Sequence, residues 1–162
     1  MLVLEKDSDT DSRASFISNL RPNYFAEKEN VLALAYQQFY IDEKISFIKI
    51  DVEGAEYEVL KGMSKAIEKY QPIITCEVLD SHSMEAFEFT QNRAIKLCQL
   101  LHSWNYNIIR LETNDVRIIN FESIDFIRIV QWSPRSYMLN DYLFYPKSKK
   151  NEVINTLIKV IE

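Results

Sequence analysis

Short apolar runs alternate along this chain with longer segments in which apolar residues recur at helical spacing. The runs predict three strands, at residues 45–52, 72–78 and 106–111. The segments between and after them predict helices from about Ala55 to Gly62, after Ser64, and from about Met84 to Trp104. Strands and helices that alternate in this way are typical of βαβ units. The pattern therefore predicts an α/β fold with a mostly parallel sheet and flanking helices.

Residues at the predicted helix ends suggest where each helix begins and ends. Gly62 is expected to end the first helix in the left-handed cap position, and Ser64 to cap the second. Pro72 excludes further helix. Glu56 and Glu58 suit the positive N-terminal end of the helix that starts near Ala55.

The two ends of the chain are less regular. Residues 5–15 are polar and predict an exposed loop, and residues 31–40 predict a short strand followed by about two turns of helix. Residues 142–145 predict a terminal strand, and residues 149–162 an amphipathic helix. Residues 116–139 contain apolar runs whose partners the sequence does not identify.

Composition narrows the class of protein. With 162 residues, 47% hydrophobic and 27% charged, the chain is expected to form one globular domain. Its net charge of −5, with acids and bases interspersed, argues against nucleic-acid binding. No apolar run reaches membrane-spanning length, and the apolar run at residues 1–4 is too short for a signal peptide, so we expect a cytoplasmic protein without membrane association. Cys76 and Cys98 lie in apolar segments and are expected to be buried free thiols.

Acidic residues follow two of the predicted strands. Asp51 and Glu53 come at the end of the strand at 45–52, and Glu77 and Asp80 follow the next strand. Parallel strands joined by right-handed crossovers end at one edge of a sheet, so we expect these four acids to cluster. They could bind a hydroxylated or cationic ligand, hold a metal ion or act as a general base. Alternatively, they cap helices and bond loop amides without a catalytic role.

Other kinds of chemistry have weaker signals. His82 lies beside Asp80, where it could carry a proton or be a plain surface histidine. No zinc or EF-hand spacing occurs, so no metal site is expected. There is no GxSxG motif, and we expect no nucleophilic enzyme.

The most specific signal lies at residues 47–62. Phe-Ile-Lys-Ile-Asp-Val-Glu-Gly-Ala-Glu, followed by Val-Leu-Lys-Gly at 59–62, resembles the signature of FkbM-type methyltransferases. The resemblance continues through residues 71–78 and 140–144 and covers roughly residues 30–146. It implies an S-adenosylmethionine-dependent enzyme with a Rossmann-like class I methyltransferase fold. Such enzymes methylate hydroxyls, often on sugars or other small metabolites.

The resemblance also implies roles for particular residues. Asp51, Glu53 and Gly54 would bind the cofactor. Asp51 and Glu53 would be the catalytic residues, with Asp51 as the first candidate for the base. Glu77, Asp80 and His82 would border the pocket of a small-molecule acceptor, such as a saccharide.

The chain departs from the family pattern before residue 45. The family carries a glycine-rich cofactor loop after its first strand, whereas no glycine precedes Gly54 here. We therefore expect residues 1–162 to be a single, N-terminally truncated FkbM-like domain with a partial Rossmann-like sheet, closed by the helix at 149–162. An alternative is a non-catalytic remnant or interaction module that retains half of a methyltransferase fold.

The missing first strand yields a prediction about assembly. In the family the strand at 47–52 is central, so here it would form an exposed and largely apolar sheet edge. We predict that the chain forms a homodimer through this edge, needs a partner segment, or is only marginally stable. Analytical ultracentrifugation and thermal melting over a range of concentrations measure this. A monomer that melts sharply and cooperatively at low concentration would contradict it.

Overall fold

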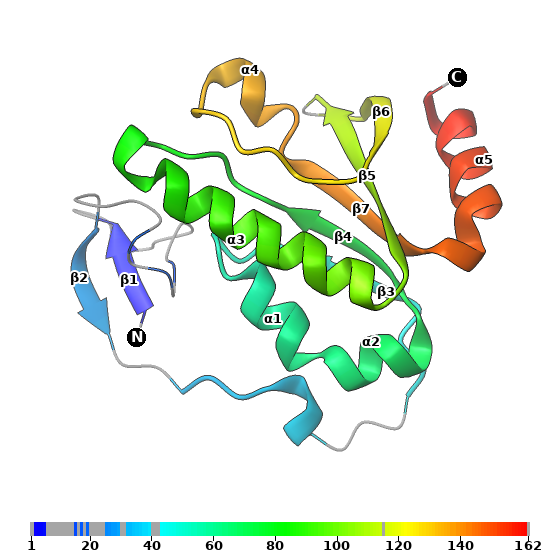
Figure 1. Ribbon diagram of the computed structural model, residues 1–162, viewed down its shortest axis with the longest axis horizontal. Coiled ribbons are helices and arrows are strands. Elements are labelled where there is room, and N and C mark those ends of the chain that lie inside the picture. Colours follow the sequence, from blue (N-terminus) through cyan, green and yellow to red (C-terminus); the bar gives the residue numbers. More distant parts are fainter. Residues whose placement is uncertain are drawn as a thin grey trace.

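The computed structural model describes residues 2–5, 15, 17, 19, 25–29, 32–39, 43–114 and 116–161. They form a mixed α/β fold in which helices flank a five-stranded sheet (Figure 1). The sheet contains β3 (Phe47–Ile50), β4 (Ile73–Glu77), β5 (Tyr106–Thr113), β6 (Ile118–Ile124) and β7 (Asp141–Pro146). A separate antiparallel pair consists of β1 (Leu2–Glu5) and β2 (Phe25–Glu29).

The strands of the main sheet lie in the order β3-β4-β7-β5-β6. Among these described strands only β3 and β4 pair in parallel, and the other three pairings are antiparallel. The prediction of a mostly parallel sheet is therefore wrong. The physical reason is that β7 returns from the end of the chain and inserts between β4 and β5. Because β4 and β5 are both antiparallel to β7, β3, β4 and β5 point in the same direction, and their carboxyl ends lie at one edge.

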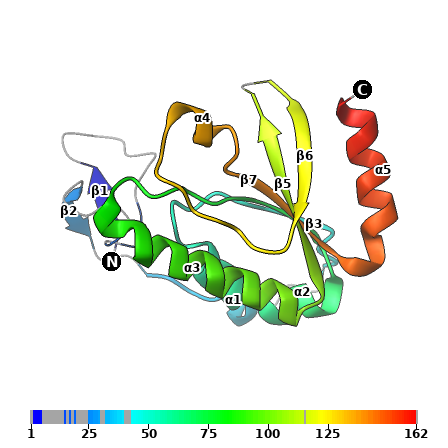
Figure 2. The ribbon, with the colours of Figure 1, turned by 45° about the horizontal axis from the view of Figure 1, so that its top comes forward.

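Helices cover both faces of this sheet (Figures 1 and 2). On one face lie α1 (Glu56–Gly62), α2 (Ser64–Tyr70) and α3 (Met84–Ser103), and on the other lies α5 (Lys150–Ile161). Successive strand residues point to opposite faces. Phe144 therefore lies in the larger core beneath α1–α3, and Leu143 lies in the smaller core beneath α5. The remaining helical turns are η1 (Tyr36–Gln38), α4 (Pro134–Tyr137) and η2 (Lys147–Lys149).

The strand and helix predictions hold in the middle of the chain, but two predicted caps are wrong. Gly62 lies inside α1, and the C-cap of that helix is Met63, whose φ is −107°. Ser64 is the first residue of α2 and not its cap. The residue that does adopt the left-handed conformation is Gln71, at the end of α2, with φ of 50°. The two short helices thus share a single junction residue.

The less regular regions also differ from prediction. In place of the predicted strand and helix, residues 32–35 have no regular structure and Tyr36–Gln38 form the short 3-10 helix η1; residues 40–42 lie outside the described residues. Ser15 is buried, and Glu5 ends β1; residues 6–14 lie outside the described residues. Residues 116–139 supply β6, α4 and a loop whose Ile127 and Ile129 enter the core beneath α3.

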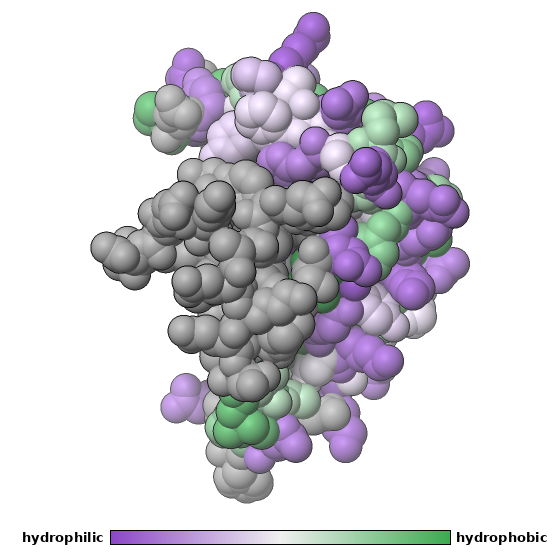
Figure 3. Space-filling view, turned by 90° about the vertical axis from the view of Figure 1, so that its left-hand side faces the viewer, coloured by the Kyte–Doolittle hydropathy of each residue, from purple (hydrophilic) through white to green (hydrophobic). Residues whose placement is uncertain are grey.

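The expected edge strand is present. No described strand pairs with the outer side of β3, and the Phe47 side chain is 57% exposed. The described residues on the side of the molecule shown in Figure 3 are mainly hydrophilic, with a few scattered hydrophobic ones. In the described part of the chain, no helix is long and apolar enough to cross a membrane. Cys76 and Cys98 are buried and free, as expected.

The placement of α3 predicts a difference between two aliphatic truncations. Leu101 is fully buried, so Leu101→Ala should lower the free energy of unfolding by about 2–5 kcal/mol. Ile95, on the same helix, is 37% exposed, so Ile95→Ala should cost about 1 kcal/mol or less. Urea denaturation measures both values. Equal costs for the two variants would contradict the orientation of α3.

Candidate functional site

The connection from β3 to α1 is a tight turn with an unusual backbone. The Ala55 amide donates to the Val52 carbonyl at 3.3 Å, and the two central residues, Glu53 and Gly54, have φ of 49° and 97°. Positive φ at both central positions is typical of a type I′ turn. Glycine adopts this conformation freely, whereas for glutamate it costs about 1–2 kcal/mol. Contacts around the turn must offset this cost.

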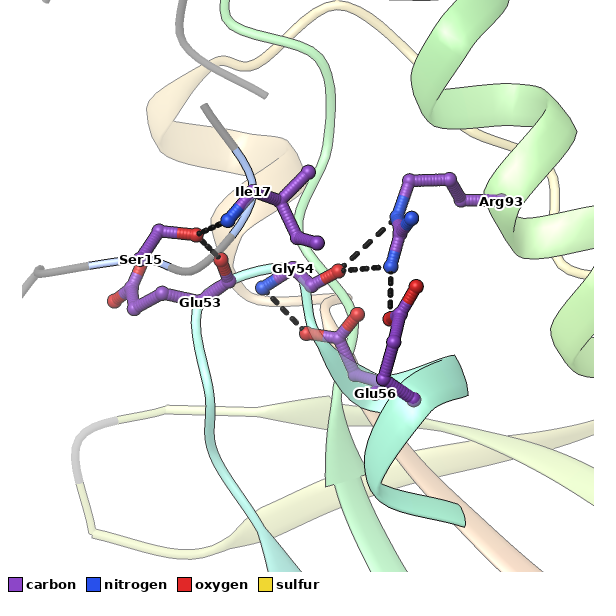
Figure 4. Close-up of polar contacts among 7 residues, drawn as sticks. Ser15, Ile17, Glu53, Gly54, Glu56 and Arg93 are labelled. Carbon is purple, nitrogen blue, oxygen red and sulfur yellow. Dashed lines mark hydrogen bonds and ion pairs between the residues drawn. The ribbon is translucent and has the colours of Figure 1, made fainter. Parts of the chain in front are cut away.

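Side chains from three segments hold this turn (Figure 4). The Ser15 hydroxyl donates to the Glu53 carbonyl at 2.5 Å, and the Gly54 amide donates to Glu56 Oε1 at 2.7 Å. Arg93 on α3 donates to the Gly54 carbonyl from Nε at 3.1 Å and from Nη2 at 2.8 Å. Both backbone polar groups of Gly54 are therefore engaged within the protein. The contribution of Gly54 to this region is the positive φ that the turn requires.

Strand register gathers carboxylates at the sheet edge. Ile50 lies opposite Cys76, so Asp51 comes next to Glu77 where β3 and β4 end, and Glu77 lies opposite Asp141 on β7. We call Asp51, Glu77 and Asp141 the edge carboxylates. The sequence predicted the first two at this edge. It did not indicate Asp141, because nothing in its neighbourhood showed that β7 inserts beside β4.

The edge carboxylates act on one another electrostatically. The pKa of Glu77 is raised from 4.5 to about 7, chiefly by burial, with smaller contributions from the nearby charges of Asp51, Asp141 and Glu53 and from a hydrogen bond with Asp51. The Asp51 side chain is 48% exposed and pairs with Lys49 at 3.7 Å. A carboxyl group with a pKa near 7 can hold or release a proton at neutral pH, which suits general acid–base chemistry.

A surface hollow opens beside the edge carboxylates, between the β5–β6 hairpin and α4. Glu77 and Asp141 line it, and the Thr113 hydroxyl donates to Asp141 Oδ2 at 3.0 Å. The hollow therefore combines acceptors, donors and apolar surface, as small-molecule sites do. Its described lining residues are Glu77, Thr113, Asn114, Val116, Arg117, Ile118, Tyr137, Met138 and Asp141.

Asp80 and His82, expected at the acceptor pocket, have other contacts. Asp80 is 6% exposed, and its Oδ1 accepts a hydrogen bond from the Val130 amide at 3.0 Å. The Asn140 amide group donates to its Oδ2 at 3.1 Å. These bonds tie the loop after β4 to the loop that follows β6. His82 is exposed, and its ring stacks on Trp132 with centroids 5.7 Å apart. Neither residue lines the hollow.

Two residues with a direct part in this region were missed from the sequence. The sequence indicated only that Glu56 suits the positive N-terminal end of α1, yet Glu56 is 6% exposed, and burial raises its pKa from 4.5 to about 7. Arg93 lies 39 residues after Gly54 in the chain, and only the packing of α3 against α1 brings the two together. The only sequence signal that could have indicated a role for Glu56 was its position two residues after Gly54.

No metal centre is indicated. Among the residues that the structure describes, no three or more histidine, cysteine, aspartate or glutamate side chains form a group that could hold a metal ion.

Comparison with known proteins identifies one family. A family model described as the methyltransferase FkbM domain matches residues 4–112, which is more than half of the chain. The matched part runs from β1 into β5 and includes the Glu53–Gly54 turn and Glu77. No curated protein and no solved structure matches the chain.

The raised pKa of Glu77 predicts a pH-dependent contribution to stability. The folded chain binds this proton more tightly than the unfolded chain, so the stabilisation is complete below about pH 4.5 and is lost as the pH rises through about 7. Glu77→Gln, which remains neutral, should therefore gain stability relative to the wild type over this range. Urea denaturation at a series of pH values measures the difference. Glu88→Gln, on an exposed part of α3, is the control, and an equal pH profile for both variants would refute the prediction.

Proposed function

The chain belongs to the FkbM methyltransferase domain family, and on that premise we propose that it transfers a methyl group from S-adenosylmethionine to a hydroxyl of a sugar or other small metabolite. The observation that carries this proposal is the pairing of Asp51 with Glu77 beside the hollow. The pKa of Glu77, about 7, gives that pair a proton-accepting group in the neutral range.

Strand direction supports a class I methyltransferase fold for this sheet. The strands β3, β4 and β5 share one direction, and β7 runs antiparallel between β4 and β5. In open α/β sheets, ligands bind beyond the carboxyl ends of such strands. Asp51, Glu77 and Thr113 all lie at those ends. We therefore propose that the described sheet is part of a Rossmann-like fold.

The chemistry of the residues fits the cofactor. When bound, S-adenosylmethionine supplies a methyl group on a positively charged sulfonium, with an ammonium group nearby. Carboxylates suit such cations, and we propose that Asp51 and Glu53 hold them. Asp51 is accessible for this purpose, since its side chain is 48% exposed. The proposed part of Gly54 is to shape the turn that presents Glu53, because its amide and carbonyl are already bonded.

Methyl transfer to a hydroxyl requires a proton acceptor. As the hydroxyl oxygen bonds to the methyl carbon, its O–H bond breaks and the bond from sulfur to that carbon breaks with it. We propose Asp51 as the base, with Glu77 sharing the proton. The hollow would orient the acceptor, with donors such as Arg117 and an exposed aromatic ring at Tyr137. Asp80 would act on the acceptor side only through the loops that it joins, and His82 would lie outside the hollow.

A second candidate function is a non-catalytic interaction module. It is favoured by the position of β3, which has no described partner on its outer side and exposes Phe47. An unpaired strand edge is a template for another chain, so a homodimer through residues 47–52 is part of this alternative. Such a module would associate without binding the cofactor, and the next experiment separates the two.

Isothermal titration with S-adenosylmethionine and transfer of a radiolabelled methyl group to a panel of hydroxylated metabolites test the first proposal. We expect micromolar cofactor binding by the wild type. Asp51→Asn should slow transfer by about 10²–10⁴-fold, because it removes the base. Asp125→Asn, an exposed aspartate after β6, should leave the rate unchanged. Absence of binding at millimolar cofactor, or full activity of Asp51→Asn, would overturn it.

A further inference from the structure

Side chains from two helices hold opposite sides of the same turn residue (Figure 4). Glu56 on α1 accepts the Gly54 amide at 2.7 Å, and Arg93 on α3 donates twice to the Gly54 carbonyl, at 3.1 and 2.8 Å. We call Glu56 and Arg93 the Gly54 clamp. Arg93 also pairs with Glu58, two residues after Glu56 on α1. The clamp therefore joins the turn to α1 and to α3.

Burial of the two charged groups of the clamp costs desolvation free energy. Glu56 is 6% exposed and the Arg93 side chain 18% exposed, so both charged groups are largely withdrawn from water. Apolar side chains of similar size would fill this space without the desolvation cost. What an apolar pair would not provide is hydrogen bonding to both polar groups of Gly54. The geometry thus assigns the clamp to the conformation of the turn and not to packing.

We propose that Glu56 and Arg93 are positioning residues: they hold the Glu53–Gly54 turn in its left-handed conformation and so fix where Asp51 and Glu53 present their carboxylates at the sheet edge. Glu53 has a φ of 49°, which its own side chain does not favour. Removal of Glu56 leaves the Gly54 amide without this acceptor, and removal of Arg93 leaves the Gly54 carbonyl without this donor. In either case the turn can relax. The identity of the ligand that Asp51 and Glu53 bind rests on the proposed function, whereas the role of the clamp in holding the turn does not.

Protonation of Glu56 should weaken the clamp. The charges that act on this carboxyl group include Arg93 on α3 and Glu58 on α1, and it acts in turn on the Cys76 thiol of β4. Burial is the largest influence and raises the pKa of Glu56 to about 7, while the bonds to backbone amides and the charge of Arg93 oppose the rise. A neutral carboxyl accepts hydrogen bonds more weakly than a carboxylate. As the pH falls through 7, the chain should gain stability from Glu56 while the Gly54 turn loosens. If Glu56 had only a structural role, the turn would not loosen over the pH range in which the chain gains stability.

The low glycine content offers a direct test. The chain has two glycines, so labelling with nitrogen-15 glycine gives two amide signals in a nuclear magnetic resonance spectrum. Gly62→Ala assigns them, and it should fold because an added Cβ would meet Ala35 at an ordinary 3.7 Å. We expect the Gly54 signal to titrate with a midpoint near pH 7 and the Gly62 signal to stay constant. Glu56→Gln should abolish this titration, and Glu77→Gln should preserve it. A Gly54 signal that does not titrate, or that titrates in Glu56→Gln, overturns the inference.

Cofactor binding provides the second arm. Glu56→Ala removes the acceptor and should weaken the affinity for S-adenosylmethionine at least tenfold, with unchanged circular dichroism. Glu56→Gln keeps a neutral acceptor and should bind within threefold of the wild type. Glu58→Gln is the matched control, because Glu58 pairs with Arg93 without touching Gly54. Wild-type affinity in Glu56→Ala overturns the inference. If the wild type binds no cofactor, the proposed function fails, and the Gly54 titration alone decides the inference.

Discussion

The main sheet depends on the hydrogen bonds that β7 makes along both of its edges. On one side it pairs with β4, and on the other it pairs with β5. Without it, β3–β4 and β5–β6 would be two separate strand pairs, and a pair of strands alone is marginally stable in water. The same insertion sends Leu143 and Tyr145 to one face and Tyr142 and Phe144 to the other, so β7 contributes to both cores.

The insertion also sets the electrostatics of the sheet edge. Asp141 starts β7 opposite Glu77, and Asp51 follows β3 on the other side, so Glu77 lies between two carboxylates. Burial is the largest cause of the raised pKa in both Glu77 and Glu56; the charges of Asp51 and Asp141 add to the rise at Glu77, whereas the charge of Arg93 opposes it at Glu56. Two glutamates with a pKa near 7 therefore lie close to the Glu53–Gly54 turn, with neighbouring charges of opposite sign. One faces the hollow that we assign to the acceptor, and the other holds the turn from within the protein.

Much of the middle of the chain could be predicted from local pattern. The strands near 47–52 and 72–78 and the stripe of α3 follow from apolar spacing, which is a property of neighbouring residues. The caps at Gly62 and Ser64 were wrong because the chain passes directly from α1 into α2, with no room for a left-handed residue between them. The mostly parallel sheet was wrong because the position of β7 depends on pairing between strands that lie more than sixty residues apart.

The sequence by itself determined that Asp51, Glu53 and Gly54 follow a strand, that Glu77 follows the next, and that the motif around them resembles the FkbM family. Short-range spacing carries all of this information. Only the tertiary structure decided that Asp141 joins Glu77, that Asp80 is used in loop contacts, and that Arg93 reaches the Gly54 carbonyl. Each of these contacts joins segments that are distant in the chain. Their formation depends on how the helices and β7 pack on the sheet, which no local pattern specifies.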